Sequence, residues 1–214
     1  DCSVTLVPAG AGMRPESGRP AWEQGHIPGS GFADLLDDLS DKTQPLPIMM
    51  PPAAQFAAAM GRYGVGPASA VVLYDSGPHT WATRVWWMLR AMGFANAAVL
   101  DGGLKKWKAE GRALSTEPCR YPAAHFEPRP QECVLVGKDH VCMLIGGQCV
   151  DQPHLRLINA LSADEHAGRV SRTARPGRIP GSGNVPAGSL LDPATGAFLP
   201  LEQLREKFEA QGAL

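Results

Sequence analysis

The chain has 214 residues, of which 44% are hydrophobic and 19% are charged, and its formal net charge is -1. This composition is typical of a soluble globular protein with room for one large domain or two small ones. The near-neutral charge gives no support for a nucleic-acid or membrane-surface partner, and no apolar run of about 18 residues predicts a transmembrane helix.

The cysteines do not suggest a disulfide framework. Five are present: Cys2, Cys119, Cys133, Cys142 and Cys149. Because the count is odd and no two form a Cys-x-x-Cys pair, we expect free thiols in a reducing compartment, and therefore a cytoplasmic protein. The first residues carry no signal-peptide pattern. The six histidines show no metal-ligand spacing, so no metal site is expected.

A heptapeptide occurs twice in the chain. Gly-x-Ile-Pro-Gly-Ser-Gly begins at Gly25 and again at Gly177, an offset of 152 residues. Phe56 and Phe208 are separated by the same offset, each within a predicted short helix that ends near a glycine. Two matches in one register indicate that one structural unit has been duplicated.

The duplication sets the expected domain boundaries. We predict a first domain over residues 1–114 and a second over residues 137–214. The linker between them, residues 115–136, mixes Pro, Glu and Arg without hydrophobic periodicity.

In the first domain, predicted strands alternate with predicted helices. Residues 68–75 form a short apolar run typical of a buried strand, and residues 80–92 place apolar side chains at helical spacing, with Thr80 as the expected N-cap. A second buried strand over 95–103 and a short helix over 104–111 follow. This order predicts an α/β fold with a parallel sheet flanked by helices on both faces.

The second domain is predicted to contain a strand over residues 155–161 and an amphipathic helix over residues 200–212. At the repeat offset, the strand and loop at 71–80 would recur near 223–232, past Leu214. We therefore expect this domain to be incomplete and to lack its own strand–turn–helix loop.

The segment Asp75-Ser76-Gly77-Pro78-His79 joins a predicted strand to a predicted helix. Backbone N–H groups converge at such a junction, and the helix dipole favours an anion there. Asp75 is thus either a general base or an anion that accepts hydrogen bonds from the unpaired N–H groups at the start of the helix. The pattern favours the second role.

Four segments together carry a resemblance to a known family. They are GHIPGS at 25–30, VVLYDSGPHTWATRVWWMLRAMGF at 71–94, VLDGGLKKWKAEGR at 99–112, and GRIPGSGNVPAGSLLD at 177–192 with LREKF at 204–208. The chain resembles the tandem rhodanese family, the thiosulfate and 3-mercaptopyruvate sulfurtransferases. This resemblance implies two rhodanese folds, of which only the second carries a nucleophilic cysteine. Asp75 stands at the corresponding position of the first.

The resemblance also implies a reaction. Sulfane sulfur would pass from thiosulfate or 3-mercaptopyruvate to cyanide or a thiol through a cysteine persulfide, without a metal or organic cofactor. None of the five cysteines follows a strand and opens a helix, so no catalytic residue is assigned within this sequence. Cys142 lies in an apolar, helix-like stretch and is expected to be buried. The alternative is a non-catalytic rhodanese-like module that binds or regulates a partner.

The resemblance implies substrate-binding roles for two arginines of the second domain. Arg169 and Arg175 match arginines that reach the anionic group of the sulfur donor, and a guanidinium suits such a group through paired hydrogen bonds. The alternative for both is a solvated basic loop. Asn159 and Arg178 depart from the aspartate and histidine that are common in the family.

Overall fold

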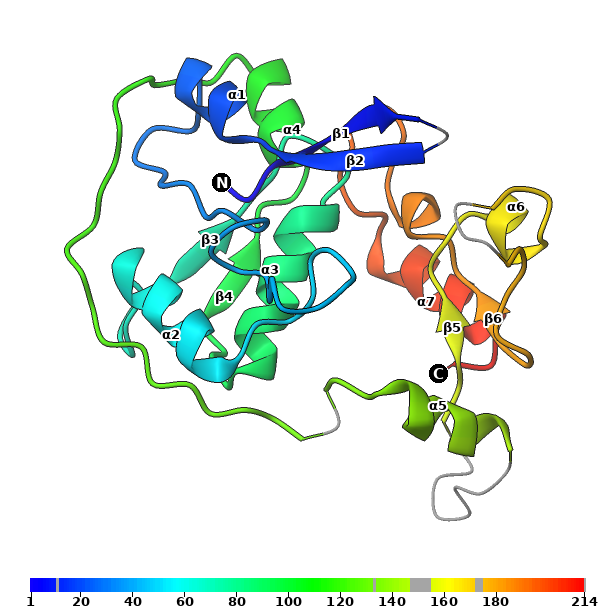
Figure 1. Ribbon diagram of the computed structural model, residues 1–214. Helices are drawn as coiled ribbons and strands as arrows, with labels where there is room; N and C mark the ends of the chain where they lie inside the picture. Colours follow the sequence, from blue (N-terminus) through cyan, green and yellow to red (C-terminus); the bar gives the residue numbers. More distant parts are fainter. Residues whose placement is uncertain (11, 133, 147–154, 172–174, 214) are drawn as a thin grey trace. The chain divides into compact units, whose positions relative to one another are not determined.

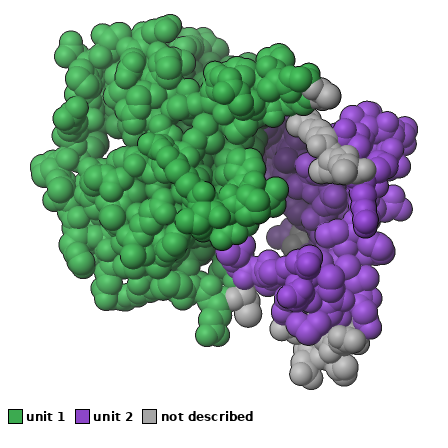
Figure 2. All heavy atoms as spheres, in the orientation of Figure 1, with its two compact units in different colours: residues 1–134 green, residues 135–214 purple. Residues whose placement is uncertain are grey.

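The computed structural model describes residues 1–10, 12–132, 134–146, 155–171 and 175–213. The chain divides into two compact units, Asp1–Val134 and Leu135–Leu214, which are coloured separately in Figure 2. The boundary between the units falls within the predicted linker.

Unit 1 contains a parallel pair of short strands, β3 (Val71–Leu73) and β4 (Ala97–Val99). Helix α3 (Thr80–Ala91) connects them, and α4 (Gly103–Ala109) follows β4 (Figure 1). The predicted α/β class and the order of these four elements are confirmed. Each strand is three residues long, shorter than the apolar run that predicted it.

An antiparallel hairpin precedes these elements. It consists of β1 (Val4–Ala9) and β2 (Gly12–Ser17), paired from Val4 with Ser17 to Ala9 with Gly12. Its side chains are mostly exposed, so it lacks the buried apolar run that identified β3 and β4 in the sequence. Two helices follow, α1 (Arg19–Gln24) and α2 (Ala53–Arg62).

The core of unit 1 is formed mainly by α2 and α3. Phe56 and Met60 of α2 are buried with Val85, Met88 and Leu89 of α3. This agrees with the apolar stripe at helical spacing in the sequence, because the face that carries the stripe is the one packed inward.

Much of the predicted linker packs against unit 1. Ser115 forms a bridge with His26, and the buried Phe126 meets the ring of Phe56 edge-on at 5.7 Å. Further along, the N–H of Arg129 donates to the carbonyl of Met92 over 2.8 Å. This segment has no hydrophobic periodicity, and individual contacts hold it to unit 1 in place of the apolar face of a helix or strand.

Unit 2 has short elements. In chain order they are α5 (Lys138–Ile145), β5 (Ile158–Asn159), α6 (Ala163–His166), β6 (Gly183–Asn184), the 3-10 helix η1 (Ala187–Leu190) and α7 (Leu201–Glu209). Strands β5 and β6 pair in parallel. Among the described residues of unit 2, only Glu165 and Val185 are buried in the way that core residues of unit 1 are.

The repeated heptapeptide adopts the same turn in both units. The N–H of Ser30 donates to the carbonyl of Ile27 over 3.0 Å, and that of Ser182 donates to the carbonyl of Ile179 over 3.2 Å. These two hydrogen bonds are related by the 152-residue offset.

The chain segment that bonds to the residues after each turn corresponds as well. In unit 1 the N–H of Ala33 donates to the carbonyl of Asp1, and in unit 2 the N–H of Val185 donates to the carbonyl of Asn159. The side chains of Asp1 and Asn159 each accept the N–H two residues later, over 2.7 and 2.8 Å. Asn159 therefore performs in unit 2 the same local capping that an aspartate performs in unit 1.

The helices α2 and α7 correspond at a different offset. Each follows a proline and ends near a glycine with positive φ: Pro52 and Gly64 for α2, Pro200 and Gly212 for α7. The two prolines are 148 residues apart, and so are the two glycines. Phe56 therefore corresponds to Leu204 and not to Phe208. The prediction of a single register was wrong, because four fewer residues connect turn and helix in unit 2.

Candidate functional site

The loop between β3 and α3 is built around the carboxylate of Asp75. This side chain is completely buried, and its oxygens accept backbone N–H groups from four residues of the loop and helix. The donors are Gly77 at 2.9 Å, His79 at 3.2 Å, Trp81 at 2.9 Å and Ala82 at 3.0 Å. The role of Asp75 as an anion for unpaired helix N–H groups is confirmed.

The start of α3 differs in one detail from the prediction. Thr80 is the first helical residue, and the N-cap is His79, whose φ of 64° lies in the left-handed region. No side chain at the N-cap position itself caps the helix. Asp75 takes over that function because the left-handed turn at His79 folds the loop back and directs the first helical N–H groups at the carboxylate.

The loop after β4 packs against the Asp75 loop. The N–H of Leu104 donates to the carbonyl of Asp75 over 3.0 Å, and the N–H of Gly102 donates to Nε2 of His79 over 3.2 Å. At Gly103, where φ is 52°, an added Cβ would lie 2.7 Å from the carbonyl oxygen of Asp75. The two glycines after β4 therefore allow its loop to approach the Asp75 loop closely.

Tyr74 ties the repeated turn to the same loop. Its hydroxyl lies 2.5 Å from Oγ of Ser30 and accepts the N–H of Ile27 over 3.2 Å. Burial raises the pKa of Tyr74 above its usual range. This tyrosine was missed in the sequence, although its position directly before Asp75 and the repeated serine were the two available signals.

The arrangement is a cradle for one negative charge. Four converging N–H groups lower the energy of a buried anion without a metal. A carboxylate fills this cradle in unit 1, and it has no sulfur atom to attack a donor. A thiolate or persulfide at the same position would be stabilised by the same donors, because the interaction depends on the charge.

In unit 2, Arg169 lies just after α6. Its Nε and Nη2 both donate to one carboxylate oxygen of Asp164, over 2.8 and 2.5 Å, and the side chain is 64% exposed. Helix α6 is fixed by a capping box in which Ser162 and Glu165 bond reciprocally. Arg169 is thus presented at the surface of unit 2 by an ordered turn of helix.

The other residues singled out in unit 2 are also on its surface. Arg175 is exposed, and Nη1 of Arg178 donates to the carbonyl of His166 over 3.2 Å. The chain from 172 to 174, between Arg169 and Arg175, lies outside the described residues. A joint role of Arg169 and Arg175 in holding a donor remains a prediction.

The described cysteines do not stand in a loop like that of Asp75. Cys2 is buried, and burial raises the pKa of its thiol to about 11. Cys119 is half-buried, whereas Cys133 and Cys149 lie outside the described residues. Cys142 is exposed on α5, so the prediction that it is buried was wrong. An apolar helical face predicts burial only where another element covers it, and α5 buries none of its side chains.

In the part of the chain that the structure describes, no helix has the length and apolar character needed to cross a membrane. Likewise, no group of three His, Cys, Asp or Glu side chains in these residues is arranged to hold a metal ion.

Comparisons with known proteins agree with the resemblance. Residues 14–110 match the model of the rhodanese-like domain. The chain is 34% identical to a probable 3-mercaptopyruvate sulfurtransferase of Pseudomonas aeruginosa, over 92% of this chain and 69% of that protein. It is 29% identical to a thiosulfate sulfurtransferase of Gallus gallus, over 89% of this chain and 64% of that protein.

The fold agrees with a solved structure. SseA from Escherichia coli, which has the rhodanese fold, superposes with a TM-score of 0.78 at 31% sequence identity. The match covers 92% of this chain and 72% of that one. The present chain therefore spans about two thirds of the length of the relatives that it matches.

Proposed function

Because the chain belongs to the rhodanese family of sulfurtransferases, we propose that it transfers sulfane sulfur from thiosulfate or 3-mercaptopyruvate to a thiol or cyanide. Both donors are small anions, and the relatives' names include both. The proposed carrier of the sulfur is a cysteine persulfide.

The observation that supports this proposal is the ring of N–H groups around Asp75. The ring shows that this fold places four backbone donors around a single anionic side chain at the end of a strand. In unit 1 the carboxylate of Asp75 occupies this ring, and a carboxylate cannot accept sulfur from a donor. We propose that the sulfur-carrying cysteine occupies the loop of the second unit that corresponds to the Asp75 loop.

In the proposed reaction, the thiolate attacks the transferable sulfur of the donor. With 3-mercaptopyruvate, the C–S bond breaks, and its electron pair leaves with the pyruvate enolate, which takes up the thiol proton of the donor to give pyruvate. With thiosulfate, the S–S bond breaks, its electron pair leaves with sulfite, and the enzyme holds a persulfide. Cyanide then attacks the outer sulfur of the persulfide, so that thiocyanate departs and the thiolate is restored. The N–H donors contribute by stabilising the charge on the leaving thiolate.

We further propose that Arg169 and Arg175 bind the anionic group of the donor. The guanidinium of Arg169 already holds one carboxylate, that of Asp164, through two nitrogens. A donor with a carboxylate or sulfonate-like group would offer the same oxygen geometry and compete for it. Because the side chains of Arg169 and Asp164 are both exposed, replacing Asp164 by the donor costs little free energy.

The direct test is a cyanolysis assay with each donor, on a form of the protein that carries the complete second domain. Thiocyanate formation at enzymatic rates supports the proposal, and the ratio of kcat/KM for the two donors identifies the preferred one. If neither donor yields thiocyanate while the protein is folded, the non-catalytic binding module becomes the better account.

The role of Arg169 is tested by Arg169→Ala in the same form of the protein. We expect kcat/KM for the donor to fall by a factor that corresponds to a free-energy loss of about 1.5–3 kcal/mol, the range for a hydrogen bond to a charged group. Arg62→Ala is the matched control, because Arg62 is similarly exposed and also pairs with an aspartate, Asp38. Equal effects of the two substitutions would show that Arg169 is a solvated surface residue with no role in binding the donor.

A further inference from the structure

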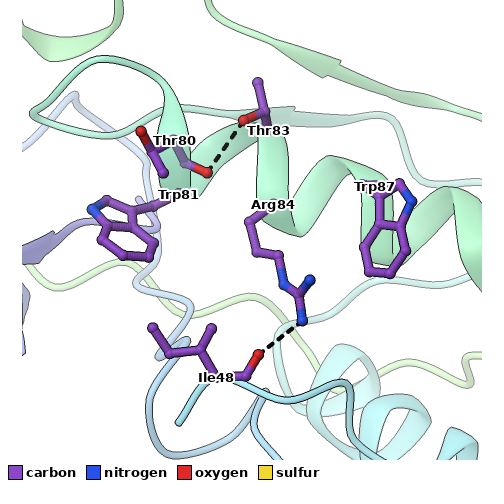
Figure 3. A pocket seen from close by; sticks show the side chains of 6 residues that line it. All are labelled: Ile48, Thr80, Trp81, Thr83, Arg84 and Trp87. Carbon is purple, nitrogen blue, oxygen red and sulfur yellow. Dashed lines mark hydrogen bonds between the residues drawn. The ribbon is translucent and has the colours of Figure 1, made fainter. Parts of the chain in front are cut away.

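A pocket of about 400 Å³ opens on unit 1 beside the first turns of α3 (Figure 3). Its lining residues are Ile48, Thr80, Trp81, Thr83, Arg84 and Trp87. Five of the six belong to one side of the helix, since side chains three or four residues apart on a helix are neighbours. Figure 3 shows Arg84 extending between the two indole rings toward the loop that carries Ile48.

Arg84 brings a poorly compensated charge into this pocket. Its Nη2 donates to the carbonyl of Ile48 over 2.8 Å, and its guanidinium carbon lies 4.9 Å from the ring centre of Trp87. Its Nε is buried and has no hydrogen-bond acceptor among the described residues. Burial lowers the pKa of Arg84 from its usual range.

The other partnered arginines have a different environment. In the described parts of the chain, five arginines form ion pairs with carboxylates: Arg14, Arg62, Arg112, Arg129 and Arg169. Arg84 is about half-buried and pairs with no carboxylate in those parts. Burying a cation without a counter-ion is unfavourable, so this site attracts an anion more strongly than a solvated arginine does.

The walls of the pocket suit an apolar body. The indole N–H groups of Trp22, Trp86 and Trp107 donate to protein acceptors. Those of Trp81 and Trp87 have no protein acceptor among the described residues, and both rings line the pocket. A ligand here would therefore meet aromatic surface beside a cation.

We propose that this pocket binds a small organic carboxylate, with the carboxylate on Arg84 and an aromatic or apolar body against Trp81. An inorganic anion would leave the indole surface uncovered, whereas a neutral aromatic molecule would leave the guanidinium without a counter-ion. The volume is near the lower end of ligand sites, which span roughly 300–1,000 Å³, and fits a molecule with a single ring. The inference does not rest on the proposed sulfur transfer, because no step of that reaction uses the side chains that line this pocket.

Benzoate is a suitable probe, and the indole N–H resonances of Trp81 and Trp87 report its binding by NMR. We expect saturable shifts of these two resonances in the full chain. Arg84→Gln should weaken benzoate binding by about tenfold or more, as expected for loss of a hydrogen bond to a charged group. Arg90→Gln is the control, because Arg90 lies on the same helix, 5.6 Å over the ring of Trp86, and is exposed. It should leave the affinity unchanged.

Two additional ligands and one variant complete the test. Benzyl alcohol and thiosulfate should both bind more weakly than benzoate, since each supplies only half of the proposed interaction. Arg84→Lys keeps the charge but not the planar fork, so it should retain part of the affinity and serves if Arg84→Gln fails to fold. Absence of saturable shifts, equal affinity for benzoate and benzyl alcohol, or equal affinity in the two glutamine variants would each contradict the proposal.

Discussion

Replacing Asp75 by alanine should destabilise unit 1 severely. The substitution leaves four N–H donors in a buried loop without their acceptor. Hydrogen bonds to a charged group contribute about 1.5–3 kcal/mol each, which sets an upper limit on the order of 10 kcal/mol for four independent bonds. The four share one carboxylate and the loop can relax, so we expect about 3–5 kcal/mol, as for loss of one partner of a buried charge.

The stability of unit 1 can be measured separately, because all five tryptophans of the chain lie in it. Urea unfolding followed by tryptophan fluorescence therefore reports on the unit that contains Asp75. Asp41→Ala is a suitable control, since Asp41 also accepts a backbone N–H, that of Thr43, in an exposed turn. Its expected cost is below about 1 kcal/mol.

Asp75→Asn refines the test. Asparagine keeps one oxygen acceptor but directs an NH₂ group at the remaining donors, so this variant should fall between wild type and Asp75→Ala. If Asp75→Ala costs no more than Asp41→Ala, the carboxylate does not organise the loop, and the interpretation of this site as an anion cradle is refuted.

Three further substitutions test the surroundings of the cradle in the same urea experiment. Gly103→Ala should cost about 2 kcal/mol or more, because the new Cβ would lie 2.7 Å from the carbonyl oxygen of Asp75 and φ is positive; a neutral effect would contradict the close approach. His79→Ala should cost about 1–3 kcal/mol by leaving the N–H of Gly102 without its acceptor, whereas an unchanged midpoint would exclude that hydrogen bond. Burial raises the pKa of Cys2 from 9.0 to about 11, so its thiol favours the folded state below pH 9, and that contribution, about 2–3 kcal/mol, should disappear as the pH rises through 11. Cys2→Ala should flatten this pH dependence, and an unchanged alkaline slope would show that other groups cause it.

The features predicted correctly from the sequence are those that short segments determine by themselves. The apolar run before Asp75 and the apolar stripe of α3 specify a strand and a helix, and the polar turn between them requires an anion for its N–H groups. The repeated heptapeptide likewise determines its own turn, so the same hydrogen bond recurs in both units. These inferences need no knowledge of distant contacts.

The features that were missed depend on contacts between distant segments. His79 meets Gly102, and Tyr74 meets Ser30, across separations that no periodicity reveals. The burial expected for Cys142 failed for the related reason that a sequence shows an apolar face but not whether another element covers it. The shift from 152 to 148 residues between turn and helix could be located only from the helix ends themselves.

The central claim is that the cradle of unit 1 carries no sulfur and that sulfur transfer depends on a cysteine in the counterpart loop of the second unit. The most direct measurement is a cyanolysis assay, with thiosulfate and with 3-mercaptopyruvate, on a preparation whose intact mass matches these 214 residues. We predict that this preparation forms no thiocyanate above the uncatalysed rate, whereas a protein that also contains the counterpart loop with its cysteine does. Thiocyanate formation at enzymatic rates by the 214-residue chain would contradict the account and redirect attention to Cys142 and Cys149.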